Sequence, residues 1–469
     1  MVFSSSIFLF AFLPLFLAVY FLMPKRAAKN IVLLAFSLLF YAWGEPVYVW
    51  LMILSIAFNW AFGYVISRCR KATSKKLLLI LDLALNIAIL GFYKYEGFLA
   101  HNINRAIGEE FIAELDLALP IGISFFTLQA ITYVVDVYRG KVDAQKNPLY
   151  LGMYIAMFPQ LVAGPIVRYA DIEHEIDNRK VTLAGFTQGL RLFCIGLGKK
   201  VLLANTAGIL ADSLLPRSAS EIGFIGCFSG VAAYTFQIYF DFSGYSDMAI
   251  GLGRIMGFRF AENFRYPFVS GSLTEFWRRW HISLGSWFRD YVYIPLGGSR
   301  VGKARWVRNL VIVWGLTGLW HGAAWNFVAW GLYFAAFLLL EKLFLGRWLK
   351  RVPVLGHVYV LLAALFSFVL FDAASVPAAL GTAGGLLGLG GLPLWDSGAL
   401  YYLRSYAPVL ALAAVGSTPL PAALCRRIAA GRAGRVLDAL EPAALLALLA
   451  VCTAFLVSGS ANPFLYFRF

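Results

Sequence analysis

Charged side chains are scarce in this sequence: Asp, Glu, Lys and Arg together make up 14% of its 469 residues. A soluble globular chain carries roughly 25%, so there is too little polar surface here to cover a protein that faces water. Hydrophobic residues make up 60% of the chain, and much of its surface must therefore face lipid. Histidine is also rare, with five in the whole chain.

The sequence also lacks the short motifs of several enzyme classes. It contains no Walker A loop and no GxGxxG, GxSxG or HExxH sequence, so kinase, dinucleotide-binding, serine-hydrolase and zinc-protease interpretations have no support. Its five cysteines form no CxxC pair, and most lie in or beside apolar segments, where a free thiol is ordinary. We therefore expect no disulfide, no metal site and no bound cofactor.

Long apolar runs are what the sequence has instead. A spanning helix needs about 20 mostly apolar residues, and a segment in lipid must satisfy its own backbone hydrogen bonds, which favours helices. The alternating pattern of a membrane β-barrel is not seen. The sequence therefore predicts an all-α integral membrane protein. The expected spans are 3–23, 47–66, 77–95, 117–137, 222–240, 311–340, 354–371 and 443–457.

The net charge of +15 has a simple explanation in where the basic residues lie. Lys and Arg cluster in short segments between apolar runs, whereas the loop at 96–116 is acidic. Because Lys and Arg accumulate in cytoplasmic loops, this alternation indicates a multi-pass protein of the bacterial inner membrane. We expect membrane lipid around it and no nucleic-acid partner. The basic segments lie near 25–29, 68–76, 139–146, 347–351 and 426–435.

Polar and charged side chains interrupt the apolar sequence mainly in its middle third, about residues 120–330. Such residues are costly in a bilayer and usually mark function or a water-filled cavity. The polar stretches elsewhere are too short to fold alone. We therefore expect one membrane domain over residues 1–469, with its catalytic core at about 120–330.

One imidazole, that of His321, lies within the apolar run 311–340. At 1.5 Å per residue this run exceeds the roughly 30 Å of a bilayer core, so we expect it to be tilted, or broken near 322–326. His321 is either a histidine hydrogen-bonded inside a helix bundle or a functional group. An ionisable side chain in a membrane core is costly, and composition alone supports both interpretations.

A second histidine, His281, lies in the segment LTEFWRRWHISLGSWFRDYVYIPLGG at 273–298. Helical spacing puts Phe276, Trp280, Trp287 and Tyr291 on one face and charged residues on the other. This pattern predicts a helix that lies in the membrane interface. His281 is either an interfacial histidine that binds a lipid headgroup or nothing at all, or it takes part in catalysis. The two arginines before it either grip lipid phosphates or hold the phosphates of an acyl carrier.

Two aspartates, Asp241 and Asp247, lie beside the apolar run that ends at residue 240. A carboxylate in this setting needs a partner or must stay protonated. Either aspartate could orient a histidine. Pairing with Arg254 or Arg265 is the simpler expectation.

Taken together, these motifs resemble those of the membrane-bound O-acyltransferases. They are closest to the bacterial branch that acetylates exported polysaccharides such as alginate. The likeness runs nearly end to end, and the combination of FWRRWHISL with LWHG is its most specific part. Other matching segments are MVFSSSIFLFAFLP (1–14), LLFYAWG (38–44), GFYKY (91–95), LPIGISFFTLQAITYVVDVYRG (119–140), FPQLVAGPIVR (158–168), FDFSGYSDMAIG (240–251), NFRYPF (263–268) and NPFLYFRF (462–469).

The resemblance implies a bundle of about ten to twelve helices, some of them re-entrant or interfacial, around a catalytic tunnel through a thinned bilayer. It implies that His321 is the catalytic histidine and His281 the second one. It also implies a donor substrate that is acetyl-CoA or another acyl thioester from the cytosol. The acceptor is a polysaccharide, or a periplasmic acetyltransferase partner, on the outer side. Residues near the histidines are expected to contact substrate: Trp320, Asn326, Trp277, Arg278, Arg279, Asp241 and Asp247.

Histidine chemistry agrees with this expectation. A hydroxyl is a poor nucleophile until a base removes its proton, and histidine is the usual base near neutral pH. A dry apolar setting favours the neutral imidazole that such a base requires. Whether His321 is the base or carries the acyl group stays open, as does the polymer. The alternatives are D-alanyl transfer to teichoic acid and a non-enzymatic transporter or scaffold of a polysaccharide-export complex.

Overall fold

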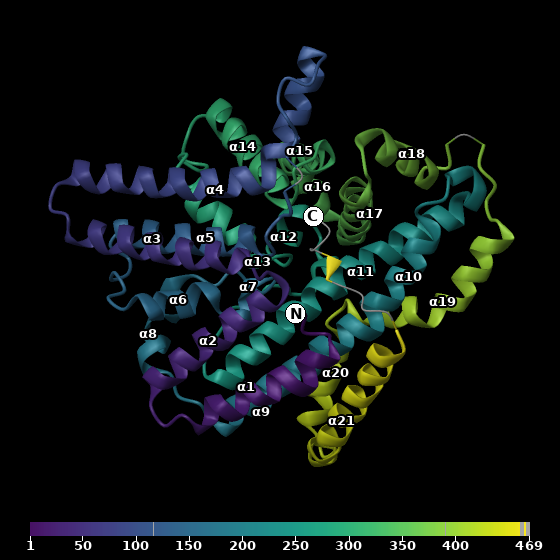
Figure 1. Cartoon of the computed structure of the whole chain (residues 1–469). Helices are drawn as coiled ribbons and strands as arrows, with labels where there is room; N and C mark the ends of the chain where they lie inside the picture. The colour runs from purple at the N-terminus through teal and green to yellow at the C-terminus, as the bar shows by residue number, and fades with distance from the viewer. Residues whose placement is uncertain (116, 390, 460–463, 466–469) are drawn as a thin grey trace. The chain divides into compact units, whose positions relative to one another are not determined.

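The computed structural model describes residues 1–115, 117–389, 391–459 and 464–465. Every regular element in these ranges is a helix, and no strand is assigned in them. Figure 1 shows the arrangement of these helices. The chain forms two compact units, one of Met1–Phe193 with Ser246–Ala261, and one of Cys194–Tyr245 with Glu262–Phe469. The predicted all-α class is confirmed, whereas a single domain over residues 1–469 stays a prediction.

Both units are built from helices of very different lengths. The first contains η1 (Phe8–Phe12), α1 (Leu13–Leu22), α2 (Arg26–Gly44), α3 (Tyr48–Arg68), α4 (Ala72–Ile107), α5 (Ile123–Tyr138), α6 (Pro148–Ala156), α7 (Phe158–Leu161) and α8 (Tyr169–Asn178). Residues of α9 (Leu183–Gly198) and α11 (Ala219–Met256) belong to both units. The second contains η2 (Lys199–Ala204), α10 (Asn205–Leu214), η3 (Pro267–Val269), α12 (Leu273–Phe276), α13 (Ile282–Phe288), η4 (Arg289–Tyr293), α14 (Lys303–His321), α15 (Trp325–Leu340), η5 (Glu341–Leu345), α16 (Gly346–Arg351), α17 (Pro353–Asp372), α18 (Val376–Leu386), α19 (Ser397–Gly416), α20 (Leu420–Ala429) and α21 (Gly434–Ser458).

Eight helices in the described ranges are long and apolar enough to cross a membrane, or up to nine if the bent pair α19 and α20 is one span. The protein is therefore a multi-pass membrane protein. The number is below the ten to twelve helices that the resemblance implies, because shorter apolar helices, such as Phe8–Leu22 and Ile123–Tyr138, do not count among the eight. Two of the eight were not predicted: Arg26–Gly44, which begins within a basic segment, and Leu183–Leu214, in which basic residues interrupt the apolar pattern.

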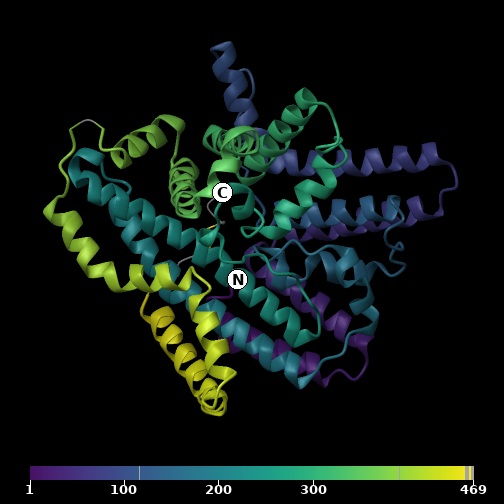
Figure 2. The same cartoon turned by 180° about the vertical axis from the view of Figure 1, so that it is seen from behind.

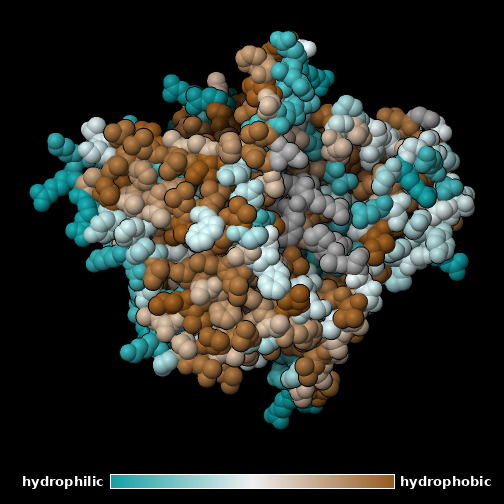
Figure 3. Space-filling view, in the orientation of Figure 1, coloured by the Kyte–Doolittle hydropathy of each residue, from teal (hydrophilic) through white to brown (hydrophobic). Residues whose placement is uncertain are grey.

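Hydrophobic residues cover much of the surface in view in Figure 3. Trp50 in α3 is 70% exposed and Ile87 in α4 is 60% exposed. Large apolar patches are rare on soluble monomers, so these side chains are expected to face lipid.

In the first unit α3, α4 and α5 lie side by side (Figure 1 and Figure 2). Asn59 of α3 and Asn86 of α4 are buried there, and the Nδ2 atom of each donates to the Oδ1 atom of the other at 3.2 and 3.1 Å. Side-chain hydrogen bonds between membrane helices satisfy polar groups that lipid could not. This amide pair joins the two helices.

In the second unit α14 and α15 approach each other through glycines. A Cβ atom on Gly331 would lie 2.2 Å from the carbonyl oxygen of Trp314, and one on Gly318 would lie 2.3 Å from that of Phe327. Small residues of this kind let membrane helices approach closely. The helix breaks after His321, and α15 begins at Trp325. The predicted break near 322–326 is therefore confirmed.

Candidate active site

The segment 273–298 is not one helix: α12 is separated by residues 277–281 from α13, which continues into η4, so the prediction of one continuous interfacial helix is wrong. The first, α12, ends at Phe276, and α13 begins directly after His281. His281 itself has a left-handed backbone, with φ 43° and ψ 54°. This conformation costs on the order of 1–3 kcal/mol in a residue other than glycine and is concentrated at functional sites. The left-handed residue lies directly before the first residue of α13, and its side chain is buried, with His281 only 1% exposed.

Asn263 determines which nitrogen of His281 carries the proton. Its Oδ1 atom accepts hydrogen bonds from the backbone N–H of Ser283 at 3.1 Å and from the Ser283 hydroxyl at 2.9 Å. The same oxygen lies 3.2 Å from Nδ1 of His281. Because a backbone N–H always donates, the atom facing it is an acceptor, and Nδ1 must therefore be protonated. The lone pair of the neutral ring is then on Nε2, where it can accept a proton.

The other surroundings of His281 are aromatic. Its ring centroid lies 4.5 Å from that of Phe242, 6.0 Å from that of Trp320 and 6.3 Å from that of Phe264. The Nε2 atom is buried and has no hydrogen-bond partner among the described residues. Burial lowers the pKa of His281 from 6.5 to about 3, because the imidazolium would lose its hydration. The ring is therefore neutral at physiological pH.

His321 is the last residue of α14 and is 5% exposed. Three aromatic rings meet its imidazole edge to face, with centroid distances of 4.9 Å to Trp320, 4.9 Å to Trp330 and 5.3 Å to Phe371. Trp330 belongs to α15 and Phe371 to α17. Three helices thus hold this imidazole in apolar surroundings.

Trp320 connects the two histidines. Its ring contacts that of His321 on one helix and that of His281 on another segment, at the distances given above. The two histidine motifs, which are well separated along the chain, therefore meet at one tryptophan. Both predicted catalytic residues belong to a single buried site in the second unit.

A cavity of about 430 Å³ with a basic lining, here called the basic cavity, lies beside this site. Arg278, Arg289 and Lys342 line it, and its other walls are largely apolar. Arg289 also pairs with Asp290 at 2.7 Å. Thr317 lines the cavity too, which places part of its wall one helical turn before His321 on α14.

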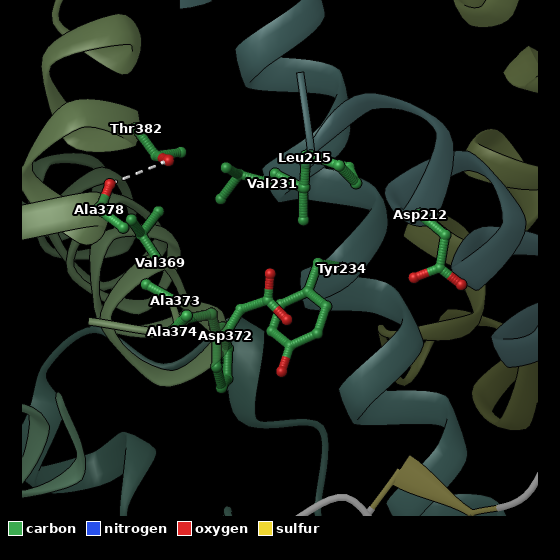
Figure 4. A pocket seen from close by; sticks show the side chains of 12 residues that line it. Asp212, Leu215, Val231, Tyr234, Val369, Asp372, Ala373, Ala374, Ala378 and Thr382 are labelled. Carbon is green, nitrogen blue, oxygen red and sulfur yellow. Dashed lines mark hydrogen bonds between the residues drawn. The ribbon is translucent and has the colours of Figure 1, made fainter. Parts of the chain in front are cut away.

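A second cavity, of about 290 Å³, is here called the acidic cavity (Figure 4). Asp212 at the end of α10 and Asp372 at the end of α17 line it, together with Tyr234. None of the described residues that line it is basic. Asp372 directly follows Phe371, whose ring contacts His321. The basic cavity is thus lined one helical turn from His321 on α14, and the acidic cavity is lined by the chain neighbour of a ring that contacts His321.

Two of the predicted substrate contacts face the basic cavity. Trp277 and Arg278 both line it. Arg279 instead pairs with Glu275 at 2.8 Å and donates a hydrogen bond to the carbonyl oxygen of Arg265 at 3.2 Å. This arrangement favours a structural role for Arg279, and its predicted contact with substrate stays a prediction.

Asn326 is buried and connects α15 to α17. Its Nδ2 atom donates to the carbonyl oxygens of Leu370 at 3.4 Å and Ala373 at 2.9 Å. These bonds hold the end of α17, and with it Phe371, near the start of α15. A substrate contact by Asn326 stays a prediction, while its role in placing Phe371 follows from the geometry.

The two aspartates of the segment 240–251 have separate surroundings. Asp241 forms a buried ion pair with Lys200 of η2, at 2.6 Å, so the expected pairing with Arg254 or Arg265 is wrong for this residue. Lys200 precedes Asp241 by a long stretch of chain, and spacing gave no sign of the contact. Asp247 is half-buried and belongs to the first unit. Its contact with substrate stays a prediction.

Sequence reasoning did not single out Asn263, Trp330 or Phe371. Asn263 begins the segment NFRYPF, but nothing in its spacing indicates a hydrogen bond to His281. Trp330 and Phe371 lie in uniformly apolar helices, where one aromatic residue looks like another. No signal in a single sequence would have found them.

Comparisons with known proteins identify the family. Residues 145–376 match the membrane-bound O-acyltransferase family. A protein of Pseudomonas putida named probable alginate O-acetylase AlgI is 38% identical, with 100% of both chains covered. The chain belongs to the membrane-bound O-acyltransferase family. The Azotobacter vinelandii protein of the same name is 42% identical over 81% of this chain and 76% of its own length. A peptidoglycan O-acetyltransferase of Helicobacter pylori is 34% identical over 84% of this chain and 81% of its own.

Membership of this family makes the protein an O-acyltransferase, an enzyme that needs an acyl donor and an acceptor hydroxyl.

Proposed function

We propose that the protein moves acetyl groups from a cytosolic acyl thioester, across the bacterial inner membrane, to hydroxyl groups of an exported alginate-like polysaccharide. The supporting observation is that His281 and His321 share Trp320. A basic cavity is lined by Thr317, one helical turn from His321, and an acidic cavity by Asp372, the chain neighbour of Phe371. The names of relatives that match over most of their length point to O-acetylation of a polysaccharide.

The basic cavity suits the acyl donor. α15 is followed by η5 and α16, whose Lys342, Arg347, Lys350 and Arg351 mark a cytosolic end by the positive-inside rule. Lys342 lines the basic cavity together with Arg278. Their charges would bind the phosphates of acetyl-CoA or of another thioester carrier. The apolar wall would hold the acyl arm.

The acidic cavity suits the acceptor. α17 begins at Pro353, just after this cytosolic segment, and Asp372 is at its other end. The cavity is therefore assigned to the outer side of the membrane. Carboxylates such as those of Asp212 and Asp372 accept hydrogen bonds from hydroxyl groups. The hydroxyl belongs either to the polysaccharide itself or to a periplasmic acetyltransferase that passes the acetyl group on.

The proposed transfer forms one bond and breaks another. The acceptor oxygen bonds to the thioester carbonyl carbon, and the carbon–sulfur bond breaks. We assign removal of the hydroxyl proton to His321, and this proton then goes to the leaving thiolate, so the products are an ester and a thiol. His281, with its lone pair on Nε2, supports the transfer by accepting or returning a proton. The aromatic rings around both histidines exclude water, which would otherwise hydrolyse the thioester.

Two other functions make different predictions. D-alanyl transfer would require a D-alanyl carrier protein as donor, and the relatives that cover most of the chain are named for O-acetylation. A transporter or scaffold of an export complex would leave both histidines dispensable.

The test follows label from radiolabelled acetyl-CoA, with purified protein in proteoliposomes and a glycan or periplasmic partner as acceptor. We expect His321→Ala to lose about 10²–10⁴-fold in rate, as removal of a general base does. The control is His101→Ala, because His101 is exposed and pairs with Glu114 at 3.1 Å in the first unit's acidic loop. Equal label movement in wild type and His321→Ala would remove His321 from the mechanism.

A further inference from the structure

Leu465 is held in the second unit by a buried carboxylate. The Oδ2 atom of Asp241 accepts a hydrogen bond from the backbone N–H of Leu465 at 2.7 Å. The Oδ1 atom of Asp241 pairs with Nζ of Lys200 at 2.6 Å, and these two side chains are only 3% and 5% exposed. A buried ion pair is favourable only when its geometry is good and its other hydrogen bonds are made. The backbone of the C-terminal segment supplies one of those bonds.

Phe464, the residue before Leu465, is connected to His281 by one intervening aromatic ring, that of Phe242. Phe464 is buried, and its ring centroid lies 5.2 Å from that of Tyr245 and 5.8 Å from that of Phe242. Phe242 in turn meets the imidazole of His281 edge to face at 4.5 Å. Phe464 therefore contacts the ring that itself contacts His281.

Asp241 and Phe242 are neighbours on α11, and so are Phe464 and Leu465 at the end of the chain. Asp241 and Leu465 form the hydrogen bond, and Phe242 and Phe464 form the aromatic contact. Leu465 also belongs to the hydrophobic core that contains Trp280 and Trp330. The segment is thus fixed at two adjacent points within the core that surrounds the histidines.

We propose that Phe464 is a positioning residue of the active site: the C-terminal segment, anchored by Asp241, presses Phe242 against His281 and keeps water from its imidazole. This inference rests on the proposed function for its effect on transfer. Its structural part, the covering of His281, stands independently of which reaction is catalysed.

The charges around His281 are consistent with a role in excluding water. Burial alone accounts for the low pKa of His281, with no contribution from a neighbouring charge. On α11 the nearby charge is Asp241, which Lys200 neutralises. On the segment of His281 itself, Arg279 pairs with Glu275 and Arg278 lines the basic cavity. Water admitted by loss of the Phe464 ring would therefore raise the pKa of His281 toward its ordinary value.

The experiment compares Phe464→Ala with Phe455→Ala in the full-length protein. Phe455 is a phenylalanine of α21 that is 51% exposed, so its loss should leave the site intact. The first readout is the rate at which diethyl pyrocarbonate modifies His281, followed by mass spectrometry. The reagent acylates neutral imidazoles that it can reach, and this readout needs no enzymatic activity. The second readout is kcat as a function of pH.

For Phe464→Ala we expect modification of His281 at least about tenfold faster, a kcat lower by about tenfold or more, and an acid limb of the pH profile that moves upward. Phe464→Leu, which restores apolar volume, should recover part of the protection. If Phe464→Ala matched Phe455→Ala in both readouts, the inference would be wrong. If Phe464→Ala unfolds, Phe464→Leu takes its place in the comparison with Phe455→Ala. Faster modification of His281 in folded Phe464→Leu would then support the inference, and an equal rate would overturn it. If Phe464→Ala speeds the modification of His281 but leaves acyl transfer unchanged, the proposed catalytic role of His281 would be wrong. The inference that Phe464 shields His281 from water would stand.

Discussion

The Nδ1 atom of His281 lies 3.2 Å from the Oδ1 atom of Asn263, an oxygen that already accepts two hydrogen bonds from Ser283. This arrangement places the ring proton on Nδ1 and leaves a lone pair on Nε2. A left-handed backbone at His281 brings the ring to this position. The second histidine of the site is therefore held as a neutral imidazole in one tautomer.

Asn263→Asp should change the pH dependence of acyl transfer. A carboxylate next to Nδ1 stabilises the imidazolium, so it would raise the pKa of His281 from about 3 toward or above 6.5. Below the raised pKa the ring is charged and cannot accept a proton, and kcat should therefore fall as the pH decreases through that value. Wild type should show no such fall near neutral pH, because its His281 stays neutral there. Identical profiles of kcat against pH in the two proteins would contradict the assigned tautomer.

Asparagine and alanine should differ as replacements for His281. Both remove the imidazole, so each should lower kcat by about 10²–10⁴-fold if His281 transfers a proton. Asparagine tolerates the left-handed region far better than alanine, for which this conformation costs roughly 1–2 kcal/mol. His281→Ala should therefore unfold at a lower temperature than His281→Asn. Equal unfolding temperatures would show that the backbone at His281 relaxes when its side chain is removed.

The contact between α14 and α15 offers a matched pair of glycine variants. A methyl group on Gly331 would lie 2.2 Å from a backbone oxygen, whereas one on Gly315 would have no heavy atom within 4 Å. Gly331→Ala should separate the helices and destabilise the protein by about 1–3 kcal/mol, with a loss of transfer because Trp330 and His321 move apart. Gly315→Ala should be neutral or slightly stabilising, since alanine favours helix. Thermal unfolding of both variants, measured with transfer rates, tests this; equal stability would contradict the close packing.

Arg278 and Arg279 are adjacent, but their surroundings predict different effects. Arg278 lines the basic cavity, so Arg278→Gln should raise the KM for acetyl-CoA by about tenfold, as expected for loss of one charge-assisted hydrogen bond. Arg279 pairs with Glu275, and Arg279→Gln should cost at most about 1 kcal/mol of stability, with little change in KM. Initial rates at varied acetyl-CoA give both constants. A larger KM effect at Arg279 would show that the basic cavity is not the donor site.

Much of the site follows from the sequence, but the details of its geometry do not. The break after His321 could be predicted from helix length, whereas the pairing of the two histidines as one site was implied only by the family resemblance. The turn at His281 could not, because no glycine or proline marks it and a residue with positive φ looks ordinary in a periodic pattern. The pairing of Asp241 with Lys200 could not be predicted either, because arginines nearer in the sequence carry the same charge. Contacts between distant segments depend on how the whole unit packs.

The central claim is that His281 and His321 act as one catalytic site around Trp320. The most direct test is a double-mutant cycle of single-turnover acetyl transfer, with wild type, His321→Ala, His281→Asn and the double variant in nanodiscs. If the histidines act as a unit, the double variant should lose little more rate than the worse single variant, because effects within one catalytic unit are not additive. Losses that multiply, or a single variant that transfers acetyl at the wild-type rate, would contradict the claim.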